Sequence, residues 1–164
     1  MDALSTAWRW RSSDAILHTL PLHHIHGLVN ALMCAHYNGA VVDFAPFSGR
    51  AVWARLCQRD ANVFMGVPSM YAHLLATYDA FPEEKRAACR EAAAALRLAV
   101  CGSAACPQPI MRAWQGLSGE VRACKGRACV HVACVRACGG VRACMWRACM
   151  WCPRAVVLRR VLRR

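Results

Sequence analysis

Residues 15–27 spell AILHTLPLHHIHG, and this stretch passes from an apolar run into a loop rich in histidine. The run Ala15–Leu20 stops at Pro21, and a short apolar run that ends at a breaker is typical of a strand buried on both faces. Apolar residues then recur at helical spacing over residues 28–36, and Gly39 follows where glycine commonly caps a helix. The apolar stripe of that predicted helix comprises Leu28, Val29, Leu32, Met33 and His36.

The same alternation of strand and helix continues to residue 117. Further strands are predicted at Ala40–Ala45, Asn62–Met65 and Leu96–Cys101. Helices are predicted around residues 52–57, 68–78, 83–95 and 110–117, with the alanine-rich helix 83–95 expected to be solvated. Near-continuous apolar strands that alternate with helices predict an α/β fold, here part of a doubly wound, mostly parallel sheet.

In sheets of this kind, ligands bind in loops beyond the carboxyl ends of the strands. Two loops meet this description, Pro21–Gly27 after the first strand and Gly102–Pro107 after the fourth. We therefore expect the chemistry of the protein in these two loops.

Charge divides the chain in two. The whole chain of 164 residues carries a formal charge of +12. Residues 1–120 hold 10 Lys and Arg against 9 Asp and Glu, whereas residues 121–164 hold 11 Lys and Arg, no acidic residue, and 7 of the 12 cysteines. We expect one partial domain over 1–120 and, over 121–164, an irregular or disordered tail that is not a domain.

The tail repeats Val-Arg-Ala-Cys at 121–124, 135–138 and 141–144. The repeated tetranucleotide GTGC encodes this cycle in every frame, so we interpret the tail as the translation of a simple DNA repeat. One C-x₂-C pair, at Cys149 and Cys152, does not make a zinc site. Eleven cations can attract nucleic acid, but no base-reading motif accompanies them, and we do not expect nucleic acid as a partner. The chain has no apolar run long enough for a membrane span, and no secretory signal is visible.

The histidine loop leaves three interpretations open. Three histidines in four positions can suggest a metal site. However, the adjacent His23 and His24 are expected to point to different sides, and no acidic residue or cysteine lies nearby in sequence. We therefore assign no metal ligand. In a second interpretation, the loop only leads into the following helix, and its histidines have no functional role. In the third interpretation, imidazoles at the end of a strand bind and orient an anionic substrate.

The second loop, Cys101–Pro107, consists of small residues that let a flat ligand approach the backbone closely. Ser103 does not lie in a G-x-S-x-G frame, so it is not predicted to be a nucleophile.

Three segments together carry a resemblance: LPLHHIHGLVNAL at 20–32, NVFMGVPSMY at 62–71 and AVCGSAACP at 99–107. They resemble the AMP-forming acyl-CoA synthetases, and in particular the malonyl-CoA synthetase branch, over roughly residues 8–119. The resemblance implies an N-terminal AMP-binding domain in which a carboxylic acid attacks the α-phosphate of ATP with Mg²⁺ present, and coenzyme A then takes the acyl group. It leaves the compartment open between mitochondrion and cytoplasm.

The resemblance also implies roles for individual residues. His24 matches a catalytic position beside the adenylate carbonyl, and His26 matches an acyl-pocket position where histidine suits an acid with a second carboxylate. His73 and Ser103 match positions that contact this acid in the malonyl branch, although lysine or arginine is usual at the position of His73. The predicted adenine loop comprises Gly102, Ser103, Ala104 and Ala105.

Other motifs of the family are expected outside this chain. They are the phosphate loop of the TSGTTGxPK type, the YGxTE glutamate that helps to hold Mg²⁺, and the C-terminal lysine. We therefore expect a fragment, with malonate or a related acid as the family substrate, that is inactive by itself. The alternative is a non-catalytic cationic fragment that binds nucleic acid or docks on a full-length synthetase.

Overall fold

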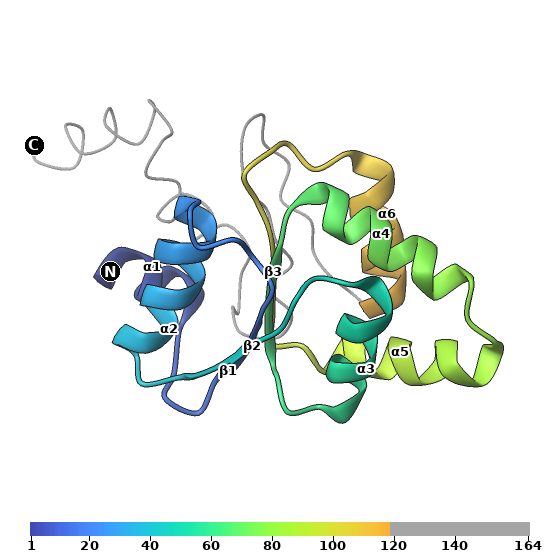
Figure 1. Cartoon of the computed structure of the whole chain (residues 1–164), viewed down its shortest axis with the longest axis horizontal. Helices are drawn as coiled ribbons and strands as arrows, with labels where there is room; N and C mark the ends of the chain where they lie inside the picture. Colours follow the sequence, from blue (N-terminus) through green and yellow to red (C-terminus); the bar gives the residue numbers. More distant parts are fainter. Residues whose placement is uncertain (119–164) are drawn as a thin grey trace, which may run out of the picture.

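A computed structural model describes residues 1–118, which form a parallel sheet of four strands with helices on both faces (Figure 1). The elements in chain order are α1 (Asp2–Trp8), β1 (Ala15–His18), the π-helix η1 (His26–Met33), α2 (Cys34–Tyr37), β2 (Val41–Phe44), α3 (Gly49–Gln58), β3 (Val63–Gly66), α4 (Pro68–Asp79), α5 (Glu83–Ala95), β4 (Leu98–Cys101) and α6 (Gln108–Ser118). This arrangement confirms the predicted α/β fold. The predicted tail lies outside the described residues.

The strands lie in the order β2-β1-β3-β4, and every neighbouring pair is parallel. Strands β3 and β4 are buried along their whole length, and β1 is nearly so, which explains their continuous apolar sequences. Strand β2 forms one edge of the four-stranded sheet, and its residues are only partly buried. All four predicted strands are thus present: β1, β2 and β4 are shorter than the apolar runs that predicted them, and β3 is displaced by one residue.

The helices divide between the two faces of the sheet. Helices α1, η1 and α2 lie on one side, and α3, α4, α5 and α6 lie on the other (Figure 1). On the second side the largest buried side chain is Trp53 of α3, which stacks on Trp114 of α6 and donates a hydrogen bond of 2.9 Å to the Leu74 carbonyl of α4. One indole therefore joins three helices.

The predicted apolar stripe over residues 28–36 is wrong, although the helix itself is present. Leu28 and Met33 are exposed, whereas Ala31, Cys34 and Ala35 are buried against the sheet. Small side chains allow the helix to approach the strands closely, and the large apolar ones then point outward. The sequence pattern favoured the bulky residues and so selected the wrong face.

The alanine-rich helix α5 is less solvated than predicted. Its charged residues face water, but Cys89, Ala92 and Ala93 are buried between α5 and its neighbours α3 and α6. Alanine buries little area per residue, so the composition did not reveal this buried face.

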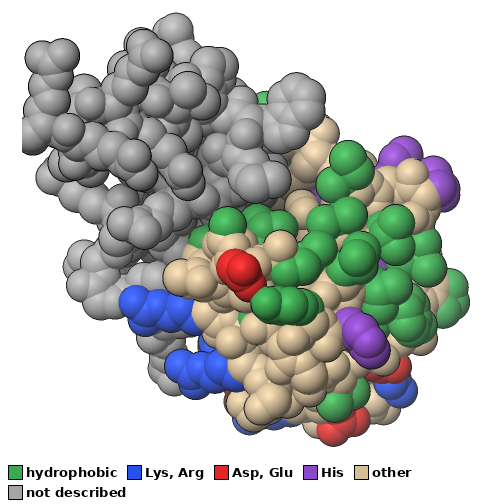
Figure 2. All heavy atoms as spheres, turned by 90° about the vertical axis from the view of Figure 1, so that its left-hand side faces the viewer, with side chains coloured by type: hydrophobic (Ala, Val, Ile, Leu, Met, Phe, Trp, Pro, Cys, Tyr) green, Lys and Arg blue, Asp and Glu red, His purple; other side chains and the backbone are tan. Residues whose placement is uncertain are grey.

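Large apolar side chains are exposed over η1, α2 and β2. Figure 2 shows hydrophobic side chains gathered on this side of the molecule. They include Leu28, Met33, Tyr37, Val41 and Phe44. Within residues 1–118, no helix is long and apolar enough to cross a membrane.

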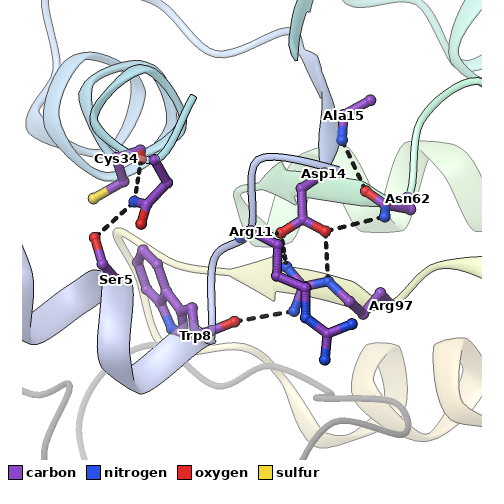
Figure 3. A network of polar contacts seen from close by, with 9 residues as sticks. Ser5, Trp8, Arg11, Asp14, Ala15, Cys34, Asn62 and Arg97 are labelled. Carbon is purple, nitrogen blue, oxygen red and sulfur yellow. Dashed lines mark hydrogen bonds and ion pairs between the residues drawn. The ribbon is translucent and has the colours of Figure 1, made fainter. Parts of the chain in front are cut away.

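A buried polar cluster joins the starts of three strands (Figure 3). Asp14, Asn62 and Arg97 each directly precede a strand, namely β1, β3 and β4. The Asp14 carboxylate is 1% exposed and accepts hydrogen bonds from Arg97 Nε at 2.8 Å, Arg97 Nη2 at 2.5 Å and Asn62 Nδ2 at 3.1 Å. Asn62 Oδ1 accepts from the Ala15 amide, and Arg97 Nη1 donates to the Trp8 carbonyl at 3.0 Å. The cluster thus fixes the strand starts and holds α1 against them.

We expect Asp14→Asn to lower the free energy of unfolding by about 3 kcal/mol, because it leaves the guanidinium of Arg97 buried without its counter-charge. Urea unfolding at neutral pH measures this change. Asp79→Asn, at the exposed end of α4, is the control and should change stability by less than about 0.5 kcal/mol. Equal effects of the two substitutions would contradict the role given to the cluster.

Candidate functional site

The two loops that the sequence selected meet beyond the carboxyl ends of the strands. His26 Nδ1 lies 3.1 Å from Ser103 Oγ, although 77 positions separate the two residues in the chain. The backbone amide of Gly102 donates to the Gly66 carbonyl at the end of β3, at 2.9 Å. The second loop is therefore held against the sheet on one side and against the histidine loop on the other.

His26 is the buried centre of this contact. Its side chain packs so closely on Gly102 that a Cβ at that position would lie 2.9 Å from His26 Cε1, so the site requires a glycine there. The neighbouring Gly27 is equally confined, because a Cβ there would lie 2.2 Å from the Pro21 carbonyl oxygen. Two glycines thus allow both loops to close around the imidazole.

The environment of His26 keeps its ring neutral. Burial, together with the smaller effect of nearby His18, lowers the pKa of His26 from 6.5 to about 4. Its Nε2 is buried and has no hydrogen-bond partner among the described residues. A neutral imidazole has one donor and one acceptor nitrogen, so at neutral pH its contact with the Ser103 hydroxyl can run in either direction.

Ser103 differs from His26 in both exposure and backbone. It is exposed, and its φ of 67° lies in the left-handed region that non-glycine residues rarely adopt. A backbone held in this region costs of order 1–3 kcal/mol and persists only where its surroundings enforce it. The contact with His26 is one such restraint, and it leaves the Ser103 hydroxyl at the surface of the loop.

The other predicted site residues lie apart from this contact. His24 is exposed, and its ring centroid lies 4.2 Å from that of His23, so the expectation that these two rings point to different sides is wrong. The loop bends tightly enough to bring adjacent side chains together. His73 is exposed on α4, where its ring meets the edge of Phe47 at 5.7 Å. No hydrogen bond or ring contact within residues 1–118 links either histidine to His26 or Ser103.

The remaining residues of the predicted adenine loop divide by exposure. Gly102 is buried, whereas Ala104 and Ala105 are exposed beside Ser103. The side chains between Ser103 and Cys106 are single methyl groups, which leave room for a ligand to approach the backbone closely.

His18 supports the site, although the sequence analysis did not select it as a site residue. It is 2% exposed at the end of β1, and its Nε2 lies 2.9 Å from the Gly27 carbonyl oxygen. The contact ties the start of η1 to the strand below it. Nothing in the sequence indicated this, because the predicted strand continued to Leu20, whereas the strand in the structure ends at His18.

Within residues 1–118, no three His, Cys, Asp or Glu side chains gather in a group that could hold a metal ion. The imidazoles of the first loop are divided between a buried one and an exposed pair. The exposed polar group at this contact is the Ser103 hydroxyl, which can hydrogen-bond an organic ligand with polar groups.

A parallel sheet with a small-residue loop at its carboxyl edge is shared with a known family. The family model described as AMP-binding enzyme matches residues 1–126, and the chain belongs to this family. Its fold matches part of the N-terminal domain of adenylate-forming enzymes, and the predicted resemblance to malonyl-CoA synthetases is confirmed.

Three relatives show which members of the family this chain is similar to. The chain is 42% identical over 130 residues to the malonate–CoA ligase ACSF3, mitochondrial, of Xenopus laevis. The alignment covers 73% of this chain and 22% of the relative. It is also 42% identical over 131 residues to a probable CoA ligase, CCL8, of Humulus lupulus, with the same two shares, 73% and 22%. A solved malonyl-CoA ligase with methylmalonyl-CoA and AMP bound superposes with a TM-score of 0.64 at 33% identity, over 73% of this chain and 25% of that one. The chain thus spans only about a fifth of the length of its curated relatives.

The depressed pKa of His26 makes stability depend on pH. Because the unfolded chain takes up a proton near pH 6.5 and the folded chain only near pH 4, stability should fall as the pH drops through this interval. The loss due to His26 is of order 3 kcal/mol. Urea unfolding between pH 7 and pH 4 measures it against His26→Gln, which cannot titrate. If both proteins lose the same stability, His26 is not the neutral buried group.

Proposed function

We propose that residues 1–120 are the part of an acyl-CoA synthetase that holds the acid and the adenine, and that the acid is malonate or a related dicarboxylic acid. The contact between His26 and Ser103 carries this proposal, because it joins the predicted acyl-pocket residue to the predicted adenine loop. The malonate–CoA ligases among the relatives support the choice of acid. In the reaction, a carboxylate attacks the α-phosphate of ATP and releases pyrophosphate, and the thiol of coenzyme A then takes the acyl group and releases AMP.

Ser103 is the residue proposed to recognise the second carboxylate of the acid. His26 Nδ1–H donates to Ser103 Oγ in this arrangement, and the exposed hydroxyl then donates to the carboxylate. A neutral His26 suits this role, since it orients the hydroxyl without fixing a buried charge. Hydrogen bonds to charged groups contribute about 1.5–3 kcal/mol, which is enough to distinguish a dicarboxylic from a monocarboxylic acid.

The proposed nucleotide surface is the loop 102–105. Gly102 lets the backbone approach closely, and Ala104 and Ala105 present exposed methyl groups that fit the face of an adenine ring. His24, exposed at the mouth of the first loop, is proposed to lie beside the adenylate carbonyl. His73 is proposed as an outer contact of the acid. We assign no Mg²⁺ ligand within residues 1–118, where the described side chains offer no metal-binding group.

Binding of non-reactive adenylate analogues to the full chain tests the choice of acid. We expect a malonyl sulfamoyl-adenosine to bind about tenfold more tightly than its acetyl counterpart, because only the malonyl compound has a carboxylate for Ser103. Isothermal titration calorimetry measures both affinities at pH 7.

Ser103→Ala should remove most of this preference and leave binding of the acetyl compound within about twofold. Ser118→Ala, a buried serine whose hydroxyl donates to the Trp114 carbonyl, is the matched control and should keep the preference. Equal affinities of the unaltered chain for the two analogues would refute recognition of a second carboxylate.

We also propose that this chain alone does not catalyse the first half-reaction. Its 164 residues contain no serine-, threonine- and glycine-rich run of the TSGTTGxPK type to hold the phosphates of ATP. Loss of one preorganised donor commonly costs about 10²–10³ in rate, and such a loop supplies several. ATP–pyrophosphate exchange with malonate should therefore not exceed that of heat-killed protein. Exchange above that background would show that other residues supply the clamp.

A further inference from the structure

Two thiols from different helices lie in contact on the side of the sheet covered by α3 and α5. Cys57 Sγ and Cys89 Sγ are 4.0 Å apart. Cys57 lies in the last turn of α3, and Cys89 lies in the middle of α5. We propose that Cys57 and Cys89 are a redox-active pair that forms a reversible disulfide between the two helices. This proposal does not depend on the function proposed above.

Other contacts between α3 and α5 lie next to the two thiols. Two residues beyond each cysteine, Arg59 and Glu91 form an ion pair, with Nη2 and Oε2 2.5 Å apart. Helices α3 and α5 also pack against each other directly. The ion pair and the packing of the two helices therefore add contacts between α3 and α5 next to the thiol pair. Closure to a disulfide, whose sulfurs lie about 2.05 Å apart, needs a shift of about 2 Å shared between two side chains.

The two thiols differ in access. Cys57 is half-buried, whereas Cys89 is fully buried. Burial and the neighbouring Cys57 raise the pKa of Cys89 to about 12. The charge of Lys85 lowers this pKa, but its effect is the smallest of the causes. Cys89 is therefore a protonated thiol at neutral pH, and Cys57 is the one that an oxidant reaches first.

Oxidised glutathione, a low-molecular-weight disulfide, serves as the oxidant. The Cys57 thiolate attacks one sulfur of it, which forms a mixed disulfide and releases one reduced glutathione. Cys89 then loses its proton and attacks Cys57 Sγ, and the second glutathione leaves as a thiolate that takes up a proton. The two protein thiols are oxidised by two electrons, and one glutathione disulfide is reduced to two thiols.

Of the other described cysteines, Cys101 is buried and interacts with the half-buried Cys106, a second pair of thiols that lies close together in the chain. Cys34 is buried on the opposite side of the sheet, where its Sγ lies 3.5 Å from Met1 Sδ. Within residues 1–118 it has no contact with another cysteine, so it serves as the reference for an unpaired thiol. A disulfide between Cys57 and Cys89 would close a loop that includes β3 and α4, and so would restrict the unfolded chain.

Peptide mapping of the full chain tests the proposal directly. The chain is equilibrated with mixtures of reduced and oxidised glutathione, quenched by alkylation and digested with trypsin. Cleavage after arginine places Cys57 in the peptide 56–59 and Cys89 in the peptide 87–90. We expect these two peptides to appear joined by a disulfide as the main oxidised form of Cys57, and to separate when dithiothreitol is added.

Thermal unfolding provides a second measurement. The oxidised chain should melt about 5–15 °C above the reduced chain. Cys57→Ser should abolish both the joined peptide and this difference, because it removes the accessible partner and leaves the buried Cys89 in place. Cys34→Ser is the matched control and should retain both.

Three results would overturn the proposal. The first is that Cys57 is still found as an alkylated free thiol after treatment with oxidising mixtures. The second is that it accumulates only as its mixed disulfide with glutathione. The third is that it joins mainly to a cysteine other than Cys89. Each of these is read from the peptides of the unaltered chain, so the conclusion does not depend on whether a variant folds.

Discussion

The carboxylate of Asp14 is the group on which the arrangement of the strands most depends. It is almost completely buried and accepts hydrogen bonds from Arg97 and Asn62, residues that lie directly before two other strands. A buried charge of this kind is tolerated only with a full set of partners, so it fixes their positions closely. Three strands thus begin at one shared point, and the backbone of α1 joins them through the Trp8 carbonyl.

Parallel strands that begin together also end together, and this places the loops of the site. The turn after β1 and the turn after β4 emerge at the same edge, where His26 of one contacts Ser103 of the other. The contact needs glycine at 27 and 102, because any side chain there would collide with the Pro21 carbonyl or with the imidazole itself. The polar cluster at one end of the sheet and the imidazole at the other are therefore two consequences of one strand order.

Burial gives each group in these regions its chemical character. His26 is kept neutral by the apolar surroundings that also hide its Nε2, and Cys89 is kept protonated in the same way. The partner of each is more accessible: Ser103 is exposed, and Cys57 is half-buried. In both pairs the less exposed member is the fixed one, and the accessible member is the one proposed to meet a ligand or an oxidant.

The order of strands and helices from residue 15 onward, the parallel sheet and the two loops at its carboxyl edge follow from the sequence, because apolar period, proline and glycine act locally. Helix α1 was not predicted. The buried face of η1 does not follow from the sequence either, since Ala31 and Cys34 are inside while the larger Leu28 and Met33 are outside. Nor do the partners of Asp14, which lie 48 and 83 positions away along the chain, or the meeting of Cys57 with Cys89. Contacts between distant residues depend on how closely whole elements approach, and only the packed sheet sets that distance.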